Sequence, residues 1–223
     1  MSGKRTYRDS CGIARALDRV GERWALLIAR ELVLGPKRFT DLRAGLPGIG
    51  PDVLAQRLRD LEAAGVVRRR ELPAPAASRV YELTEWGAKL EPVLVALGRW
   101  GSRAALPAGA APLGVDAALV ALQTTFDPAA AIALDETYGL VLDDQGFVIS
   151  VSDGALKIRR RTDPGPDPVA AVTVATDTGT LAAIAWHGRG LADALADGAV
   201  TLVGDPGAAE RLLSLFRAPV PAG

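Results

Sequence analysis

The sequence has few of the residues on which disulfide, metal and membrane chemistry depend. Its 223 residues include one cysteine, Cys11, and one histidine, His187. A single cysteine excludes an internal disulfide framework, and the two residues together argue against a cysteine-rich or histidine-cluster metal site. No apolar run approaches the roughly 18 residues of a spanning helix, and the polar N-terminus lacks the apolar region of a secretory signal. We therefore expect a cytoplasmic protein without a metal, a cofactor or a membrane partner.

What is present is an ordinary globular composition, with 49% apolar and 23% charged residues. The net charge of zero conceals two halves of opposite sign. Residues 1–105 hold 19 Lys and Arg against 12 Asp and Glu, a balance of +7, whereas residues 106–223 hold 7 against 14, a balance of −7. The segment 106–114 is uncharged and rich in Pro, Gly and Ala, as a linker is. We predict a basic domain over 1–105, a linker over 106–114 and an acidic domain over 115–217.

The basic domain is predicted to contain helices followed by a hairpin. Apolar spacing and breakers indicate helices over Cys11–Val20, Glu22–Leu34, Phe39–Leu46 with Thr40 as N-cap, and Pro51–Ala64. Short strands over 66–71 and 79–83 flank a proline-rich loop, and Thr84 caps a final helix that runs to about Arg103. The final helix has a longer apolar stripe than one small domain covers, which favours dimerisation.

The helix that begins at Pro51 is the most informative segment. Leu54, Leu58 and Leu61 recur at helical spacing and are expected to face the core. Asp52, Gln56 and Arg59 then project from the opposite side, while Arg57 lies near the edge of the apolar stripe. A slim helix with polar side chains fits the major groove of DNA, and a basic hairpin suits the flanking phosphates. This order of elements is typical of a winged helix-turn-helix domain.

Several motifs carry a more specific resemblance. They are Cys11-Gly-Ile-Ala-Arg-Ala-Leu-Asp18, Gly21-Glu-Arg-Trp24, Arg30-Glu-Leu32, Arg38-Phe39 with Asp41-Leu42, Leu54-Ala-Gln-Arg-Leu-Arg-Asp-Leu-Glu62 and Tyr81-Glu-Leu-Thr84. In this order they resemble the HxlR-type, MarR-like transcriptional regulators, over about Tyr7 to Arg103. The sequence departs from that family at Cys11-Gly12, where the family usually has Cys-Pro.

The resemblance implies a homodimer that binds double-stranded DNA at a dyad-symmetric operator, with a dimer interface formed by the first and last helices. It also places residues near DNA. Together with the helical geometry, it gives as candidates for DNA contact Arg38, Thr40, Pro51, Asp52, Gln56, Arg57, Arg59, Arg68 and Arg79.

The acidic domain is predicted to be α+β. A helix over Val115–Thr125 precedes strands over 137–142, 147–152, 155–160 and 169–175, and a fifth strand over 199–203. Helices are expected from Asp177 or Thr178 to Trp186, over Leu191–Leu195, and from Asp205-Pro206 to Phe216. The motifs Thr176-Asp177-Thr-Gly-Thr-Leu181, Gly190-Leu-Ala-Asp-Ala-Leu-Ala-Asp-Gly198 and Gly204-Asp205 with Arg211-Leu-Leu213 resemble the sterol-carrier-protein-2-like fold. That resemblance implies an apolar cavity for a small hydrophobic ligand.

Three functional hypotheses follow for the acidic domain and its connection to DNA. In the first, a small hydrophobic effector binds near Phe126, Tyr138, Phe147 or Trp186 and switches a transcriptional regulator. In the second, Cys11 senses thiol-reactive compounds at a helix N-terminus, close in sequence to Lys4, Arg5 and Arg8. In the third, the acidic domain is a lipid carrier or an enzyme with a DNA-binding tether. No nucleophile–base pair is evident from spacing, so we expect no enzyme.

Overall fold

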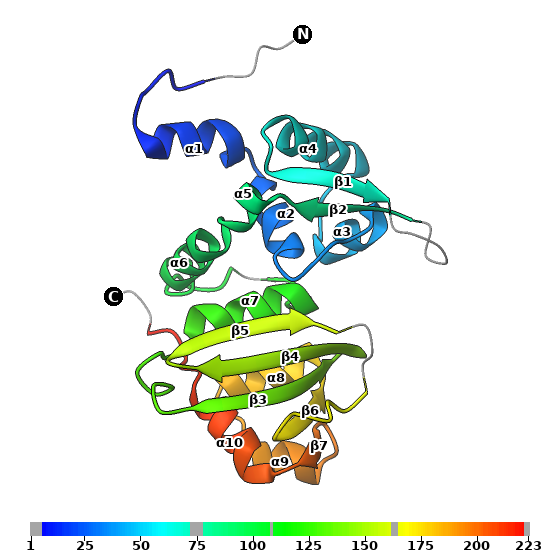
Figure 1. Ribbon diagram of the computed structural model, residues 1–223, viewed down its shortest axis with the longest axis vertical. Helices are drawn as coiled ribbons and strands as arrows, with labels where there is room; N and C mark the ends of the chain where they lie inside the picture. The colour runs from blue at the N-terminus through cyan, green and yellow to red at the C-terminus, as the bar shows by residue number, and fades with distance from the viewer. Residues whose placement is uncertain (1–5, 72–77, 108, 162–164, 221–223) are drawn as a thin grey trace. The chain divides into compact units, whose positions relative to one another are not determined.

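The computed structural model describes residues 6–71, 78–107, 109–161 and 165–220. Lys4, Arg5 and residues 72–77 of the predicted hairpin loop lie outside these ranges. The chain forms two compact units, Met1–Leu94 and Val95–Gly223. None of the described helices combines the length and apolar character that a bilayer-spanning segment requires. The architecture is mixed α+β with an N-terminal winged helix-turn-helix unit, as the sequence predicts (Figure 1).

The first unit consists of short helices around a leucine-rich core, followed by a two-stranded wing. Its elements are α1 (Gly12–Val20), α2 (Ala25–Leu32), α3 (Phe39–Gly45), α4 (Pro51–Ala63), β1 (Val67–Glu71), β2 (Arg79–Leu83) and α5 (Glu85–Ala88). β1 and β2 are antiparallel, with Arg68 opposite Glu82. Buried side chains from α2, α3, α4 and β1 share one cluster, which includes Ile28, Leu42 and Leu58. This core holds α4 in a fixed orientation, with one face outward.

The start of the second helix and the N-cap of the third differ from the prediction. The second helix begins at Ala25 and not at Glu22, because Trp24 has a left-handed φ of 78° that a helix interior excludes. Thr40 is not an N-cap, since α3 begins at Phe39 and Arg38 occupies the cap position. The Thr40 hydroxyl instead donates to Asp41 Oδ1 at 3.3 Å. The apolar periodicity around Glu22 and the polar side chain of Thr40 do not reveal these backbone angles.

The predicted final helix is divided into α5 and α6 (Glu91–Gly101). Thr84 caps α5 as expected, because its hydroxyl oxygen accepts from the Gly87 N–H at 3.0 Å. Pro92 lacks an N–H and cannot donate to the Ala88 carbonyl four residues earlier, so a continuous helix loses a bond at this position. A proline is well tolerated in the first turn of a new helix, where α6 places it.

The second unit contains the end of α6 and a five-stranded sheet with helices. Its elements are α7 (Val115–Thr125), β3 (Asp135–Leu142), β4 (Gln145–Ser152), β5 (Ala155–Arg160), β6 (Val172–Thr176), α8 (Thr178–Trp186), α9 (Leu191–Ala196), β7 (Thr201–Gly204) and α10 (Pro206–Ser214). The strand order is β5-β4-β3-β6-β7, and only the β3–β6 pair is parallel among the described strands. Alternate residues of β4 are buried, and Figure 1 shows α8 and α10 behind the sheet.

The end of α6 belongs to the second unit, whereas the sequence predicts it in the first domain. A Cβ atom at Gly98 would lie 2.5 Å from Thr124 Cγ2, so α6 and α7 approach too closely for any larger residue. The predicted strand over 169–175 also begins later, at Val172. The C-terminal helix ends at Ser214, and Phe216 forms an isolated bridge with Phe126.

Candidate nucleic-acid interface

Helix α4 presents the polar face that its sequence predicts. Leu54, Leu58 and Leu61 are at most 1% exposed, so the apolar stripe is fixed in the core. Pro51 occupies the first helical position after Gly50, where its missing N–H costs no helical bond. Asp52, Gln56 and Arg59 are exposed, which confirms their predicted orientation, and Pro51 is exposed as well. Periodicity alone missed Val53, an apolar side chain of α4 that is 44% exposed.

The exposed polar side chains of α4 already form a chain of hydrogen bonds. The Arg59 guanidinium donates to Gln56 Oε1 at 2.6 Å, and the Gln56 amide donates to Asp60 Oδ1 at 2.9 Å. Guanidinium and amide groups are the side chains that pair with guanine and adenine edges in the major groove. These hydrogen bonds hold the guanidinium and the amide on one surface of α4, where base edges can replace their protein partners.

Arg57 differs from Arg59 in its surroundings. Its side chain is 19% exposed and forms ion pairs with Asp60 at 3.1 Å and with Glu22 at 3.4 Å. The predicted position near the edge of the apolar stripe is therefore confirmed. A direct phosphate contact by Arg57 requires it to exchange these two carboxylates, so we assign it first to the attachment of α4 to the segment before α2.

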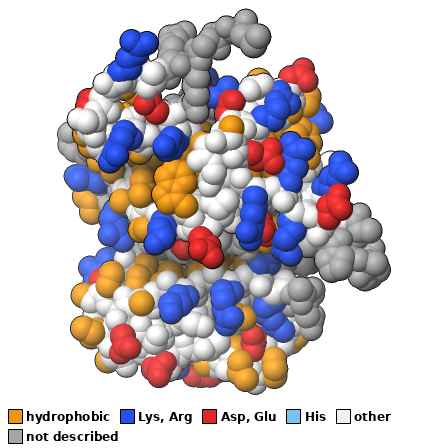
Figure 2. Space-filling view, turned by 45° about the horizontal axis from the view of Figure 1, so that its top comes forward, with side chains coloured by type: hydrophobic (Ala, Val, Ile, Leu, Met, Phe, Trp, Pro, Cys, Tyr) orange, Lys and Arg blue, Asp and Glu red, His pale blue; other side chains and the backbone are white. Residues whose placement is uncertain are grey.

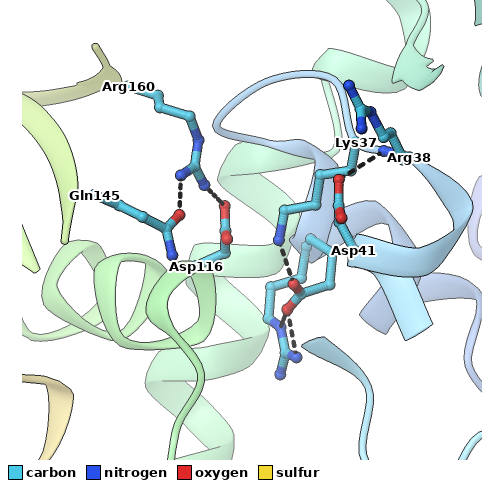
Figure 3. Close-up of polar contacts among 8 residues, drawn as sticks. Lys37, Arg38, Asp41, Asp116, Gln145 and Arg160 are labelled. Carbon is cyan, nitrogen blue, oxygen red and sulfur yellow. Dashed lines mark hydrogen bonds and ion pairs between the residues drawn. The ribbon is translucent and has the colours of Figure 1, made fainter. Parts of the chain in front are cut away.

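The position of Arg38 is fixed by the turn between α2 and α3. Lys37 forms an antiparallel bridge with Tyr81, with N–H to carbonyl distances of 2.9 and 2.8 Å. The Lys37 ammonium also binds the buried carboxylate of Glu31 at 2.7 Å. The Arg38 N–H then donates to Asp41 Oδ2 at 3.2 Å (Figure 3). Arg38 and Thr40 are exposed beyond this anchored turn, where a phosphate can reach them.

The arginines of the wing are paired with carboxylates, which the charge count did not reveal. Glu82 accepts from Arg68 and Arg70 at 2.8 Å each, and Glu71 accepts from Arg79 at 3.0 Å. On the face that Figure 2 shows, acidic side chains lie among the Lys and Arg side chains. The sequence places Glu82 in the predicted strand over 79–83. The strand register of the structure adds that Glu82 lies opposite Arg68. The local field of the wing is therefore weaker than its arginines alone suggest.

Arg69 connects the wing to α4. Its guanidinium donates to Glu62 Oε2 of α4 at 3.0 Å and lies 5.4 Å from the centre of the Tyr81 ring. The wing and α4 are thus joined by a polar contact as well as by the core.

Among the four aromatic candidates for an effector site, Phe126 lines the pocket found in the described part of the second unit. Tyr138 and Phe147 are fully buried in the sheet, and burial with the Glu136 contact raises the pKa of the Tyr138 phenol. Phe147 lies 4.7 Å below the Arg160 guanidinium. Trp186 donates from Nε1 to Thr125 Oγ1 at 3.0 Å. A pocket of about 420 Å³ in the second unit includes Phe126 but not the other three.

Arg160 joins α7 to the sheet through a partly buried polar cluster. Its guanidinium forms an ion pair of 2.7 Å with Asp116, which is 3% exposed, and also donates to Gln145 (Figure 3). Phe147 below the guanidinium completes the contact. These residues therefore have an evident structural role in the second unit.

Cys11 is exposed at the N-terminal cap of α1. Its N–H donates to Asp9 Oδ1 at 2.8 Å, and its carbonyl accepts from the Arg15 N–H at 3.0 Å. The thiol is accessible, as a sensing role requires. Of the basic residues predicted to accompany it, Lys4 and Arg5 lie outside the described residues.

Comparisons with known proteins assign each half of the sequence to a family. Residues 19–108 match the model of the HxlR-like helix-turn-helix family, and residues 107–222 match that of the alkyl sulfatase C-terminal domain. The latter match does not show the sterol-carrier-protein-2-like fold that the sequence resembles.

Individual relatives match the first half. The transcriptional regulators YvaP and YodB of Bacillus subtilis (strain 168) are each 36% identical over 88 residues, which cover 40% of this chain and 82% and 79% of theirs. The oxidised form of the redox regulator HypR aligns at 32% identity with a TM-score of 0.41, over 44% of this chain and 100% of HypR.

Proposed function

The chain belongs to the HxlR-like helix-turn-helix family through its first half and to the alkyl sulfatase C-terminal family through its second, and from this premise we propose how it regulates transcription. It is a DNA-binding transcriptional regulator. Two copies pair, place their α4 helices in successive major grooves about 34 Å apart, and bind an operator with dyad symmetry. The place of action that we propose is the cytoplasm.

The single observation that carries the DNA-binding part is the exposed face of α4. Its leucines are locked in the core, while Gln56 and Arg59 are held together on the surface. Arg38 precedes α3 in an anchored turn, and Arg68 and Arg79 lie on the wing. These side chains provide candidates for both base recognition and phosphate positioning.

The pairing part is supported by apolar side chains that remain exposed on two helices. On α1, Ile13 and Leu17 are 73% and 41% exposed, and on α6 the side chains of Val93, Leu97 and Trp100 are 52%, 45% and 76% exposed. Residues four and three apart share a helix face, so each helix presents a stripe. A second copy of the chain covers such stripes in a two-fold arrangement.

The test is selection of binding sites from random duplexes by the purified full chain, followed by footprinting. We expect an enriched sequence with two half-sites about one helical turn apart and affinity that falls steeply with salt. The control is the chain with Gln56 and Arg59 both changed to Ala, which should keep its helix content and lose the enrichment. Recovery of unenriched DNA by the unchanged protein would contradict the proposal.

For the second unit we propose a regulatory, ligand-binding role without catalysis, and a sterol-carrier-protein-2-like fold. The five-stranded sheet with helices behind it supports such a fold. The check on catalysis is incubation of the full chain with an alkyl sulfate ester, and steady release of sulfate would contradict a purely regulatory role.

Thiol sensing by Cys11 is the alternative means of regulation. It is favoured by the exposure of Cys11 at the start of α1, the helix that presents Ile13 and Leu17. Adduct formation there would alter the surface that we propose for pairing. Treatment with an electrophile should release DNA from the unchanged protein but not from a Cys11→Ser protein; an equal response of both removes this alternative.

A further inference from the structure

A pocket at the end of α6 is lined by three arginines. Its volume is about 420 Å³, and its walls come from the end of α6, the end of α7 and the C-terminal tail, all within the second unit. Arg99, Arg103 and Arg217 contribute to the lining, with Asp127 as the acidic residue among the lining side chains. The pocket is thus cationic, and its arginines come from both the basic and the acidic half of the chain.

The walls are held by backbone pairing and are not formed by side chains alone. The Asp127 N–H donates to the Leu215 carbonyl at 2.8 Å, and the Arg217 N–H donates to the Thr125 carbonyl at 3.0 Å. This bridge holds the chain after α10 against the end of α7. The rings of Phe126 and Phe216 lie 6.4 Å apart beside it. A fixed wall with an apolar ring is the usual form of a small-molecule site.

Two of the arginines are oriented by bonds that leave their outer nitrogens available. Arg99 donates from Nε to the Thr124 carbonyl at 3.1 Å, and Arg103 donates from Nε to the Val220 carbonyl at 3.3 Å. Within the described residues neither guanidinium has a carboxylate partner, whereas Arg217 is paired with Asp127 at 2.6 Å. A guanidinium that is held at Nε keeps its remaining N–H donors in a forked arrangement. This arrangement pairs with two oxygens of a carboxylate or phosphate group.

The remaining lining is apolar and hydroxyl-bearing. Phe126, Pro128, Pro219 and Val220 supply apolar surface, and Ser102 adds a hydroxyl. A ligand that satisfies this lining needs an anionic head and an apolar body. A neutral hydrophobic molecule would leave the arginines without a partner, and an inorganic anion would leave the apolar wall uncovered.

We propose that this pocket binds an amphipathic organic anion whose carboxylate, sulfate or phosphate head contacts Arg99 and Arg103. Its apolar body lies against Phe126 and the tail prolines. This site rests on the ligand-binding part of the proposed function, and its lining favours an amphipathic anion over the neutral hydrophobic effector expected from the sequence. Because α6 also carries Leu97 and Trp100, an occupant of the pocket contacts the helix that we propose for pairing.

The test is isothermal titration calorimetry of the full chain, in the absence of DNA, with decanoate, decyl sulfate, decanol and inorganic phosphate. We expect decanoate and decyl sulfate to bind saturably with one molecule per chain. Decanol and phosphate should bind at least about tenfold more weakly, since each lacks one half of the interaction. The affinities for decanoate and decyl sulfate together show whether the site prefers a planar or a tetrahedral head group. Equal affinity for decanol and decanoate would overturn the anionic site.

Variants locate the binding. Changing Arg99 and Arg103 to Gln should lower the affinity for decanoate by about tenfold or more, and changing both to Lys should lower it less, because charge is kept while the fork is lost. Arg159→Gln is the matched control, since Arg159 is exposed on β5 away from the pocket lining. Circular dichroism checks that each variant is folded; the Lys variant serves if the Gln variant is not. Unchanged affinity in a folded pocket variant would overturn the assignment. Because these titrations contain no DNA, neither outcome bears on DNA binding, which the selection of binding sites tests separately.

Discussion

At the scale of single residues, two arginines that are candidates for DNA contact already have protein partners in the absence of DNA. Arg59 is held by Gln56 on α4, and Arg79 by Glu71 on the wing. Both arginines are exposed, so exchange of a partner for a base or a phosphate removes little from the stability of the fold. The two arginines are expected to differ in what they recognise.

Arg59→Ala should weaken binding to the selected operator by about 1–3 kcal/mol, as loss of a bidentate guanine contact does. Binding to random duplex should change much less, because phosphate contacts remain. Fluorescence anisotropy with both duplexes gives the two affinities. Equal losses on the two duplexes would assign Arg59 to phosphate.

Arg79→Ala should weaken binding to all duplexes alike and reduce the slope of affinity against salt by about one counterion. The wing arginine is expected to meet the backbone, which carries no direct sequence information. Titrations at several salt concentrations provide the slope. A loss confined to the operator would instead show base recognition by the wing.

Asp177 gives a pH-dependent prediction in the second unit. Its carboxylate accepts from the Thr180 hydroxyl at 2.7 Å and from the Thr180 N–H at 2.8 Å, and these bonds lower the pKa of Asp177 in the folded state. A lowered pKa means stabilisation that is complete above the unfolded value, about 4, and is lost as pH falls through the folded value.

Asp177→Ala should therefore reduce the stability of the second unit by about 1 kcal/mol at pH 7, the usual cost of a lost N-cap. The difference from the unchanged protein should narrow as the pH falls below about 4. Urea unfolding followed by circular dichroism at several pH values measures it. Asp177→Asn is the control, because an amide keeps a cap acceptor that does not titrate. A difference independent of pH would contradict the carboxylate's role.

At the scale of elements, periodicity predicts segments well where a buried face repeats. The stripe Leu54, Leu58 and Leu61 predicts α4 and its outward face, and the alternation in 147–152 predicts β4. The sequence did not predict features that depend on backbone geometry or on a partner distant in the sequence. The left-handed conformation of Trp24 shortened α2, and the carboxylate of Glu82, distant in sequence, changed the charge of the wing. Such contacts depend on the fold, so no local pattern encodes them.

Leu58 tests how far α4 depends on its core. Leu58→Ala should destabilise the first unit by about 2–5 kcal/mol, because a fully buried side chain leaves a cavity. Hydrogen exchange should then accelerate in α4 and in the helices of its cluster. Peptides from α8 provide an internal control and should exchange as before, since α8 belongs to the other unit. An equal acceleration in α8 would show that the two units unfold together.

At the scale of the whole molecule, the opposite charges of the two halves correspond to two families in one chain. The basic half carries the helix-turn-helix, and the cationic pocket takes Arg99 and Arg103 from the basic half and Arg217 from the acidic half. α6 continues from one unit into the other, which makes it the covalent connection between the unit with the helix-turn-helix and the unit with the pocket. The pairing that we propose through α6 would bring both units of two copies into a single assembly.

Leu97→Glu tests that pairing. The substitution places a charge on the exposed apolar stripe of α6, and a charge without a partner is costly to bury in an interface. We expect the unchanged chain to sediment as a dimer and the variant as a monomer at micromolar concentration. The affinity of the monomeric variant for the operator should also be lower, because each α4 then binds its half-site alone. Val169→Glu is the matched control, since Val169 is 77% exposed outside both helices, and it should remain dimeric. A Leu97→Glu protein that stays dimeric would place the interface on another surface.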